Sequence, residues 1–173
     1  MDITPFVEFK KWARVGCRLP LVGQIKADTE TPVSLFARYQ REKYAFLLES
    51  VEGGERWGRY SFIGLYPELI FKSFGKQIEI IEGKKRRCYT ADQPLEELRK
   101  IHQQLPFVAM PGLPRFPGGA VGYVGYDQVR FFEKKIPTRA KEDLKLPDLY
   151  FVFPKIILVL DSVAHSLQIL YEA

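Results

Sequence analysis

The sequence predicts an α+β domain with a mostly antiparallel sheet and a few packed helices. Helix patterns occur early and once in the middle, so the chain lacks the regular alternation of strand and helix that is typical of a doubly wound fold. Successive strand patterns are separated by Gly75 and Gly83, which indicates an antiparallel meander. The 173 residues, 46% of them hydrophobic, suffice for the core of one large domain or two small ones.

Three segments have helix patterns. Thr4-Pro5 and Thr31-Pro32 each combine a residue that can cap a helix with a proline that fits the first turn. Apolar residues then recur at helical spacing after each pair. We expect Asp92 to cap the third helix. The apolar face of that helix comprises Leu95, Leu98, Ile101 and Leu105.

Strand patterns account for most of the remaining chain. Tyr44–Glu49 is an expected strand, and its run of apolar residues predicts burial on both faces. Gly118–Tyr126 is a glycine-rich strand in which we expect another backbone to approach closely. The other expected strands are Leu19–Ile25, Arg59–Leu65, Glu68–Ser73, Lys76–Ile81, Arg86–Tyr89, Asp148–Leu160 and Ser166–Tyr171.

Composition favours a soluble cytoplasmic protein without a nucleic-acid or membrane partner. The net charge is +5, and the one dense basic run, Lys84–Arg87, follows a turn glycine and is expected to be a solvated hairpin tip. The longest apolar run, Phe151–Leu160, is too short and too interrupted to cross a membrane, and the N-terminus lacks a signal-peptide pattern. Cys17 and Cys88 provide no disulfide framework.

Familiar cofactor, metal and nucleophile motifs are absent from the sequence. Gly118–Asp127 has Ala120 where a dinucleotide fingerprint needs glycine. Gly53–Tyr60 has Arg and Tyr where a phosphate loop needs Lys and Ser or Thr. His102 and His165 are far apart, and neither cysteine has a partner at metal-ligand spacing. We therefore expect no catalytic, metal or cofactor residue in this chain.

The strongest candidate site follows the apolar strand pattern in the first third of the chain. Glu49 and Ser50 end that strand, and after a glycine-rich loop the chain re-enters a strand through Arg59. Opposite charges and a hydroxyl beside an apolar wall suit an amino acid, with Glu49 binding the ammonium and Arg59 the carboxylate. Backbone N–H groups at the start of the Thr31-Pro32 helix are an alternative for the carboxylate. An internal ion pair of Glu49 with Arg56 or Arg59 is an equally open interpretation.

Three motifs in sequence order resemble the large subunit of anthranilate synthase, component I. The resemblance covers essentially all 173 residues and favours this enzyme over its sibling, aminodeoxychorismate (para-aminobenzoate) synthase. The motifs are Thr31-Pro32-Val-Ser-Leu-Phe, then Leu47-Leu-Glu-Ser50 with Gly54-Glu-Arg-Trp-Gly-Arg-Tyr-Ser-Phe-Ile-Gly64, then Gly118-Gly-Ala-Val-Gly-Tyr-Val-Gly-Tyr-Asp127 followed by Glu133.

The resemblance implies that residues 1–173 are the N-terminal regulatory domain, half of a larger two-domain enzyme. The family converts chorismate to anthranilate and pyruvate in tryptophan biosynthesis. Its Mg²⁺ and chorismate sites lie in a C-terminal catalytic domain that is absent from this sequence, so the chain alone is expected to be inactive. A glutamine amidotransferase subunit, component II, supplies ammonia.

The resemblance also implies a feedback site for L-tryptophan in this part of the enzyme. By position in the motifs, the effector-binding residues are Ser50, Glu49, Arg59 and Pro32. A rival interpretation is a pure domain-interaction module, in which the Gly118–Asp127 strand and the Phe151–Leu160 run pack on another domain.

Overall fold

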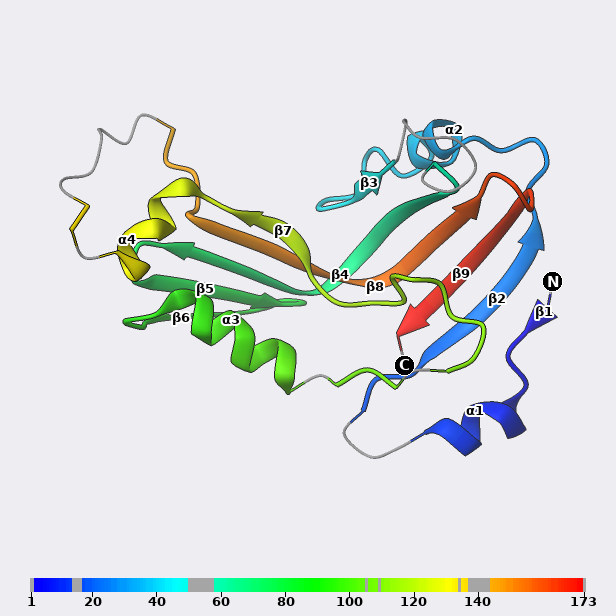
Figure 1. Ribbon diagram of the computed structural model, residues 1–173, viewed down its shortest axis with the longest axis horizontal. Coiled ribbons are helices and arrows are strands. Elements are labelled where there is room, and N and C mark those ends of the chain that lie inside the picture. Colours follow the sequence, from blue (N-terminus) through cyan, green and yellow to red (C-terminus); the bar gives the residue numbers. More distant parts are fainter. Residues whose placement is uncertain are drawn as a thin grey trace. The chain divides into compact units, whose positions relative to one another are not determined.

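A computed structural model describes residues 2–13, 17–49, 58–104, 106–108, 110–133, 135–136 and 144–172. The chain divides into two compact units, each assembled from segments that are distant in the sequence (Figure 1). Unit 1 comprises residues 1–67, 105–119 and 154–173, and unit 2 comprises residues 68–104 and 120–153. Two long strands, β4 (Tyr60–Phe74) and β8 (Leu149–Asp161), are each divided between the units, with one part of the strand in unit 1 and the other part in unit 2.

Unit 1 is a mostly antiparallel sheet with two short helices. Its strands follow the order β1-β2-β9-β8-β4, and β3 pairs with β4. The pairs β1–β2, β2–β9, β8–β9 and β3–β4 are antiparallel. Besides its parts of β4 and β8, the unit contains β1 (Asp2–Ile3), α1 (Phe6–Trp12), β2 (Pro20–Lys26), α2 (Pro32–Ala37), β3 (Phe46–Leu48) and β9 (Ser166–Glu172).

The sheet of unit 1 buries apolar side chains on both faces, because alternate residues of a strand point to opposite sides. Leu158 and Leu160 of β8 pack in one cluster with Leu35 of α2. Ile157 and Val159 of the same strand belong to a second cluster. We call the side of the sheet with the first cluster the α2 face. The opposite side, where the second cluster packs against Leu113 and Phe116 of the loop before β7, is called the loop face.

Unit 2 consists, in its described residues, of antiparallel strands with the helices α3 and α4 and a short 3₁₀ helix. β4 pairs with β5 and β5 with β6, and β7 pairs antiparallel with β8. Its most buried apolar side chains include Phe71, Ile78, Ile80 and Leu149, each at most 1% exposed. Besides its parts of β4 and β8, the unit contains β5 (Gln77–Glu82), β6 (Lys85–Thr90), α3 (Pro94–Gln103), β7 (Val121–Val124), the 3₁₀ helix η2 (Tyr126–Gln128) and α4 (Val129–Phe132).

The α+β class with a mostly antiparallel sheet is confirmed, and so are most of the predicted elements. The meander turns at Gly75 and Gly83, both with positive φ, as expected from the sequence. The predicted strands 59–65 and 68–73, however, are one strand, β4. Pro67 does not end this strand, although proline lacks the N–H group that a sheet ladder uses.

Two predicted helix caps are wrong. The hydroxyl of Thr4 donates to the backbone carbonyl of Val22 in β2 instead of capping α1. Asp92 forms an ion pair with Lys76, and the residue at the N-cap of α3 is Gln93, which makes no side-chain capping bond. In both cases a partner distant in the sequence replaces the local interaction that the pattern indicated.

The apolar run before the candidate site is shorter and more exposed than predicted. Strand β3 covers only Phe46–Leu48 and pairs with β4. Leu48 is 43% exposed, so the expectation of burial on both faces is wrong. The side chain packed on the α2 face is Leu47, and β3 therefore behaves as a strand with one buried side.

Candidate functional site

Glu49 directly follows β3 and is exposed to solvent. The expectation that it is less solvated than a surface glutamate is wrong, because Glu49 lies beyond the last residue of β3 and its side chain is open to solvent there. Leu48 pairs with Phe62, so the ladder register brings Glu49 to the end of β4 at which Tyr60 and Arg59 lie. Ser50 and Arg56 lie outside the described residues, and so does the rest of the loop from 51 to 57.

Arg59 forms a forked ion pair with Asp161 at the end of β8. Its Nε lies 2.9 Å from both carboxylate oxygens of Asp161, and its Nη2 lies 2.6 Å from Oδ2. The hydrogen bond to Asp161 raises the pKa of Arg59. The internal partner that the sequence suggested for Arg59 was Glu49, whereas the structure shows a carboxylate 102 residues away.

Asp161 is a well-anchored carboxylate. Burial opposes its ionisation, but the hydrogen bonds from Arg59 and from the backbone N–H groups of Ala164 and Val163 outweigh this effect, so the pKa of Asp161 is lowered. The turn that follows β8 also contacts the backbone of Arg59, because the N–H and hydroxyl of Ser162 both donate to the carbonyl of Arg59. In the sequence, Asp161 is recognisable only as the residue that ends a strand pattern.

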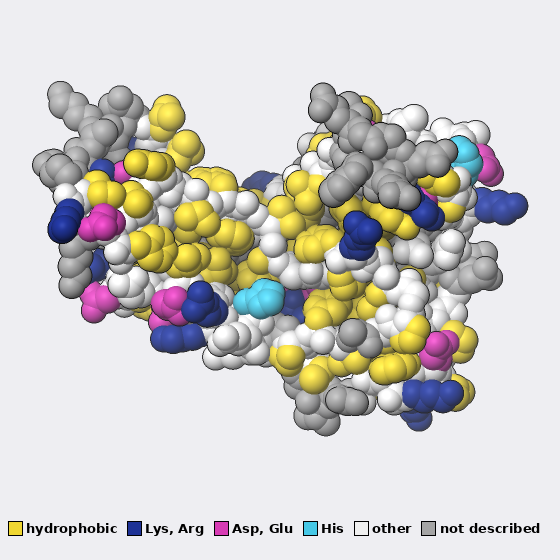
Figure 2. Space-filling model, viewed as in Figure 1, with side chains coloured by type: hydrophobic (Ala, Val, Ile, Leu, Met, Phe, Trp, Pro, Cys, Tyr) yellow, Lys and Arg dark blue, Asp and Glu magenta, His cyan; other side chains and the backbone are white. Residues whose placement is uncertain are grey.

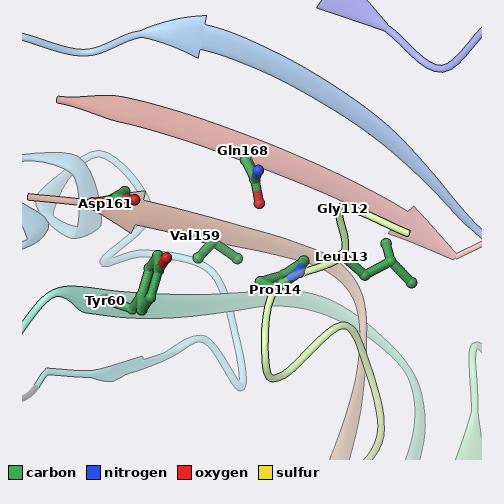
Figure 3. Close-up of a pocket in the computed structure, with 7 residues that line it drawn as sticks. All are labelled: Tyr60, Gly112, Leu113, Pro114, Val159, Asp161 and Gln168. Carbon is green, nitrogen blue, oxygen red and sulfur yellow. The ribbon is translucent and has the colours of Figure 1, made fainter. Parts of the chain in front are cut away.

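A small cavity of about 100 Å³ lies beside this ion pair on the loop face (Figure 3). Tyr60, Asp161 and Gln168 give it polar walls, and Val159 with the turn at Leu113 gives it apolar ones. Ligand pockets usually measure at least about 300 Å³. The cavity is therefore too small to hold an aromatic amino acid by itself.

Pro32 occupies the first turn of α2, as predicted. Thr31 is the N-cap, and a capping box joins it to Ser34: the N–H of Ser34 donates to the Thr31 hydroxyl, and the N–H of Thr31 donates to the Ser34 hydroxyl. Pro32 has no N–H group. The capping box therefore uses most of the helix-start donors that were considered for a ligand carboxylate.

The described residues support neither a metal site nor a membrane-spanning helix nor a basic nucleic-acid surface. No group of three or more His, Cys, Asp and Glu side chains there could hold a metal ion, and the described helices include none that could span a membrane. In the basic run, Arg86 and Arg87 form ion pairs with Glu79 and Glu82. On the face shown in Figure 2, Lys and Arg side chains are dispersed and often lie beside acidic ones.

The fold defines an α+β protein in which the exposed Glu49 and the Arg59–Asp161 ion pair lie towards the same end of the β3–β4 ladder. No protein-family model matches the chain. Curated proteins do match. Anthranilate synthase component 1 of Acetivibrio thermocellus is 40% identical over 152 residues, which cover 88% of this chain and 31% of that protein. The Pseudomonas putida protein of the same name is 36% identical over 164 residues, or 93% of this chain and 33% of its own length.

A third relative, anthranilate synthase component 1 of Acinetobacter calcoaceticus, is 35% identical over 99% of this chain and 36% of its own length. The chain thus spans about a third of the length of the curated relatives it matches. A solved structure of anthranilate synthase component I from Streptococcus pneumoniae TIGR4 has a TM-score of 0.49 and 23% identity, covering 83% of this chain and 30% of that one. The resemblance read from the motifs is confirmed by the sequence relatives, which are homologous over most of this chain.

Proposed function

We propose that this chain is the N-terminal, effector-binding part of an anthranilate synthase component I. The observation that carries the proposal is 35–40% identity to proteins of that name over 88–99% of the chain. The full-length enzyme would convert chorismate to anthranilate and pyruvate with ammonia delivered by component II. The described residues do not fit a Mg²⁺ site, since they contain no suitable acidic cluster. Following the family resemblance, we assign the Mg²⁺ and chorismate sites to the remainder of the enzyme.

L-tryptophan is the proposed effector, bound where β3 ends. Glu49 is exposed and ionisable, so it is accessible to a ligand ammonium group. Val33 of α2, 60% exposed, offers apolar surface for the indole beside Pro32, and Leu48, 43% exposed, offers a separate apolar surface at the end of β3. Ser50, the residue after Glu49, is assigned to the ammonium as well. Burying an indole against such surface contributes a few kcal/mol, at about 25 cal/mol per Å².

The carboxylate of the effector is assigned to Arg59 rather than to the start of α2. The capping box occupies the N–H groups of Thr31 and Ser34, whereas the side chain of Arg59 is 40% exposed despite its ion pair. A guanidinium has five N–H donors, so it can bind two carboxylates at once. Feedback inhibition then requires that tryptophan bind one state of the enzyme more tightly than another.

We expect Ser50→Phe to abolish feedback inhibition of the full-length enzyme. A phenylalanine side chain beside Glu49 would fill the space that the ligand head group needs. The concentration of L-tryptophan that halves the synthase rate should rise at least about 100-fold, which corresponds to about 2.7 kcal/mol of lost binding. Thr90→Phe, an exposed position on β6 in unit 2, is the matched control and should leave inhibition unchanged. A Ser50→Phe enzyme that stays sensitive to tryptophan contradicts the assignment of Ser50.

An interaction surface on unit 2 is compatible with this function. On β7 and η2, Tyr123, Val124 and Tyr126 are 42%, 51% and 85% exposed. These apolar side chains support one part of the rival interpretation, that the Gly118–Asp127 segment packs on another domain. The other part is not supported, because most apolar side chains of the Phe151–Leu160 run are buried within this chain. The effector assignment concerns unit 1 and does not depend on it.

A further inference from the structure

The ion pair between Arg59 and Asp161 fixes the guanidinium group more firmly than a surface pair would. Asp161 is 8% exposed. Its Oδ1 also accepts from the backbone N–H groups of Val163 and Ala164, each at 3.0 Å. Figure 3 shows that Asp161 and Val159 come from β8, while Tyr60 comes from β4. The carboxylate is thus held at the end of β8 by two backbone hydrogen bonds as well as by Arg59.

The geometry of the fork determines which edge of the guanidinium group is used. Asp161 accepts from Nε and Nη2 of Arg59, which form one edge of the planar group. The other edge, formed by Nη1 and the second hydrogen of Nη2, therefore points away from Asp161. The Tyr60 ring lies 5.0 Å from Arg59 Cζ and further restricts the group. Because the side chain of Arg59 is 40% exposed, an anion that bonds to this second edge need not displace Asp161.

We infer that Asp161 is a positioning residue, which holds Arg59 so that its outer edge receives the carboxylate of the amino-acid ligand. This inference rests on the proposed function, in which Arg59 binds that carboxylate. A preorganised arginine loses less side-chain freedom on binding than one that must first be ordered. Asp161 therefore increases affinity for ligands that carry a carboxylate, although it touches no part of the ligand.

The test compares two ligands on the full-length enzyme by calorimetric titration. L-tryptophan has a carboxylate, and tryptamine is the same molecule without it. The expected result for Asp161→Asn is an affinity for tryptophan about tenfold weaker, the size of one charge-assisted hydrogen bond. Its affinity for tryptamine should be unchanged. Asp92→Asn, which breaks the exposed pair with Lys76 in unit 2, is the matched control and should alter neither affinity.

The outcomes separate the positioning inference from the proposed function. Equal weakening of tryptophan and tryptamine by Asp161→Asn would show a general structural role and overturn the inference. Tighter tryptophan binding would overturn it too, because Asp161 would then compete with the ligand for Arg59. If Arg59→Ala removes the preference for tryptophan and Asp161→Asn does not, the effector site stands and the positioning role is wrong. If the wild-type enzyme binds the two ligands equally, or binds neither, the carboxylate assignment itself fails.

Discussion

Gly122→Ala is expected to destabilise the protein by about 3 kcal/mol or more, because the new methyl group has no space. A Cβ atom at this position would lie 1.9 Å from the backbone oxygen of Tyr150 and 2.7 Å from Cα of Phe151. Both atoms belong to β8, which pairs with β7 at Gly122. Backbone atoms cannot rotate away as a side chain does, so the two strands would have to separate.

Urea unfolding followed by circular dichroism measures this effect, with Gly83→Ala as the control. Gly83 has φ of +58°, and a Cβ atom at this position would have no neighbouring atom within 4 Å. Gly83→Ala should therefore cost only the strain of placing alanine in a left-handed backbone conformation, about 1–2 kcal/mol. The account predicts a much larger loss at position 122 than at position 83. Equal losses would show that β7 does not lie against β8 as described.

Arg18→Met is expected to cost about 3 kcal/mol near neutral pH, because it leaves a buried carboxylate without its cation. The side chains of Arg18 and Glu172 form an ion pair and are only 15% and 3% exposed. The backbone of Arg18 also bonds to Pro106 and Val108. The ion pair therefore joins the segment before β2 to the last strand of unit 1, and the backbone bonds of Arg18 join the same segment to the loop after α3.

The cost of Arg18→Met should depend on pH. Burial raises the pKa of Glu172, and Arg18 only partly opposes this effect. A carboxyl group whose folded pKa lies above its unfolded value binds more protons when folded, so its contribution to stability falls as pH rises through that window. Removing Arg18 removes the cation that lowers the pKa of Glu172, so the free energy of unfolding decreases more steeply with rising pH. The variant should therefore lose less stability at about pH 5 than at about pH 8.

Unfolding free energies of four proteins at both pH values provide the measurement. The set is wild type, Arg18→Met, Glu172→Gln and the double variant. In the double variant no charge is left unpaired, so its stability should recover above that of Arg18→Met at the higher pH. A loss for Arg18→Met that is the same at both pH values, and is not relieved by Glu172→Gln, would contradict this explanation.

Features that a local sequence pattern specifies could be predicted from the sequence. The Thr31-Pro32 helix start is correct because the cap, the proline and Ser34 lie within one turn. The close approach at Gly122 is correct because a glycine inside a strand often marks the place where another backbone comes near. The final hairpin is correct for a similar reason, since alternation and a short turn specify β8 and β9 locally.

Interactions between distant residues could not be predicted. Asp161 and Arg59 are separated by 102 residues, and nothing in the spacing of either one indicates the other. Thr4 and Asp92 have the composition of helix caps, but tertiary partners take their side chains. The exposure of Glu49 follows from the end of β3 at Leu48, which the apolar run before Glu49 does not reveal. Ser50 lies outside the described residues, so its role stays a prediction.

Calorimetric titration of L-tryptophan into this 173-residue chain tests the central claim most directly, with L-phenylalanine and the Ser50→Phe variant as controls. The account predicts saturable binding of tryptophan, weaker binding of phenylalanine, and loss of tryptophan binding in the variant. Repeating the titration with a chain extended to full length shows whether further residues complete the site. Absence of tryptophan binding in both the chain and the full-length protein would contradict the claim that this region is an amino-acid effector site.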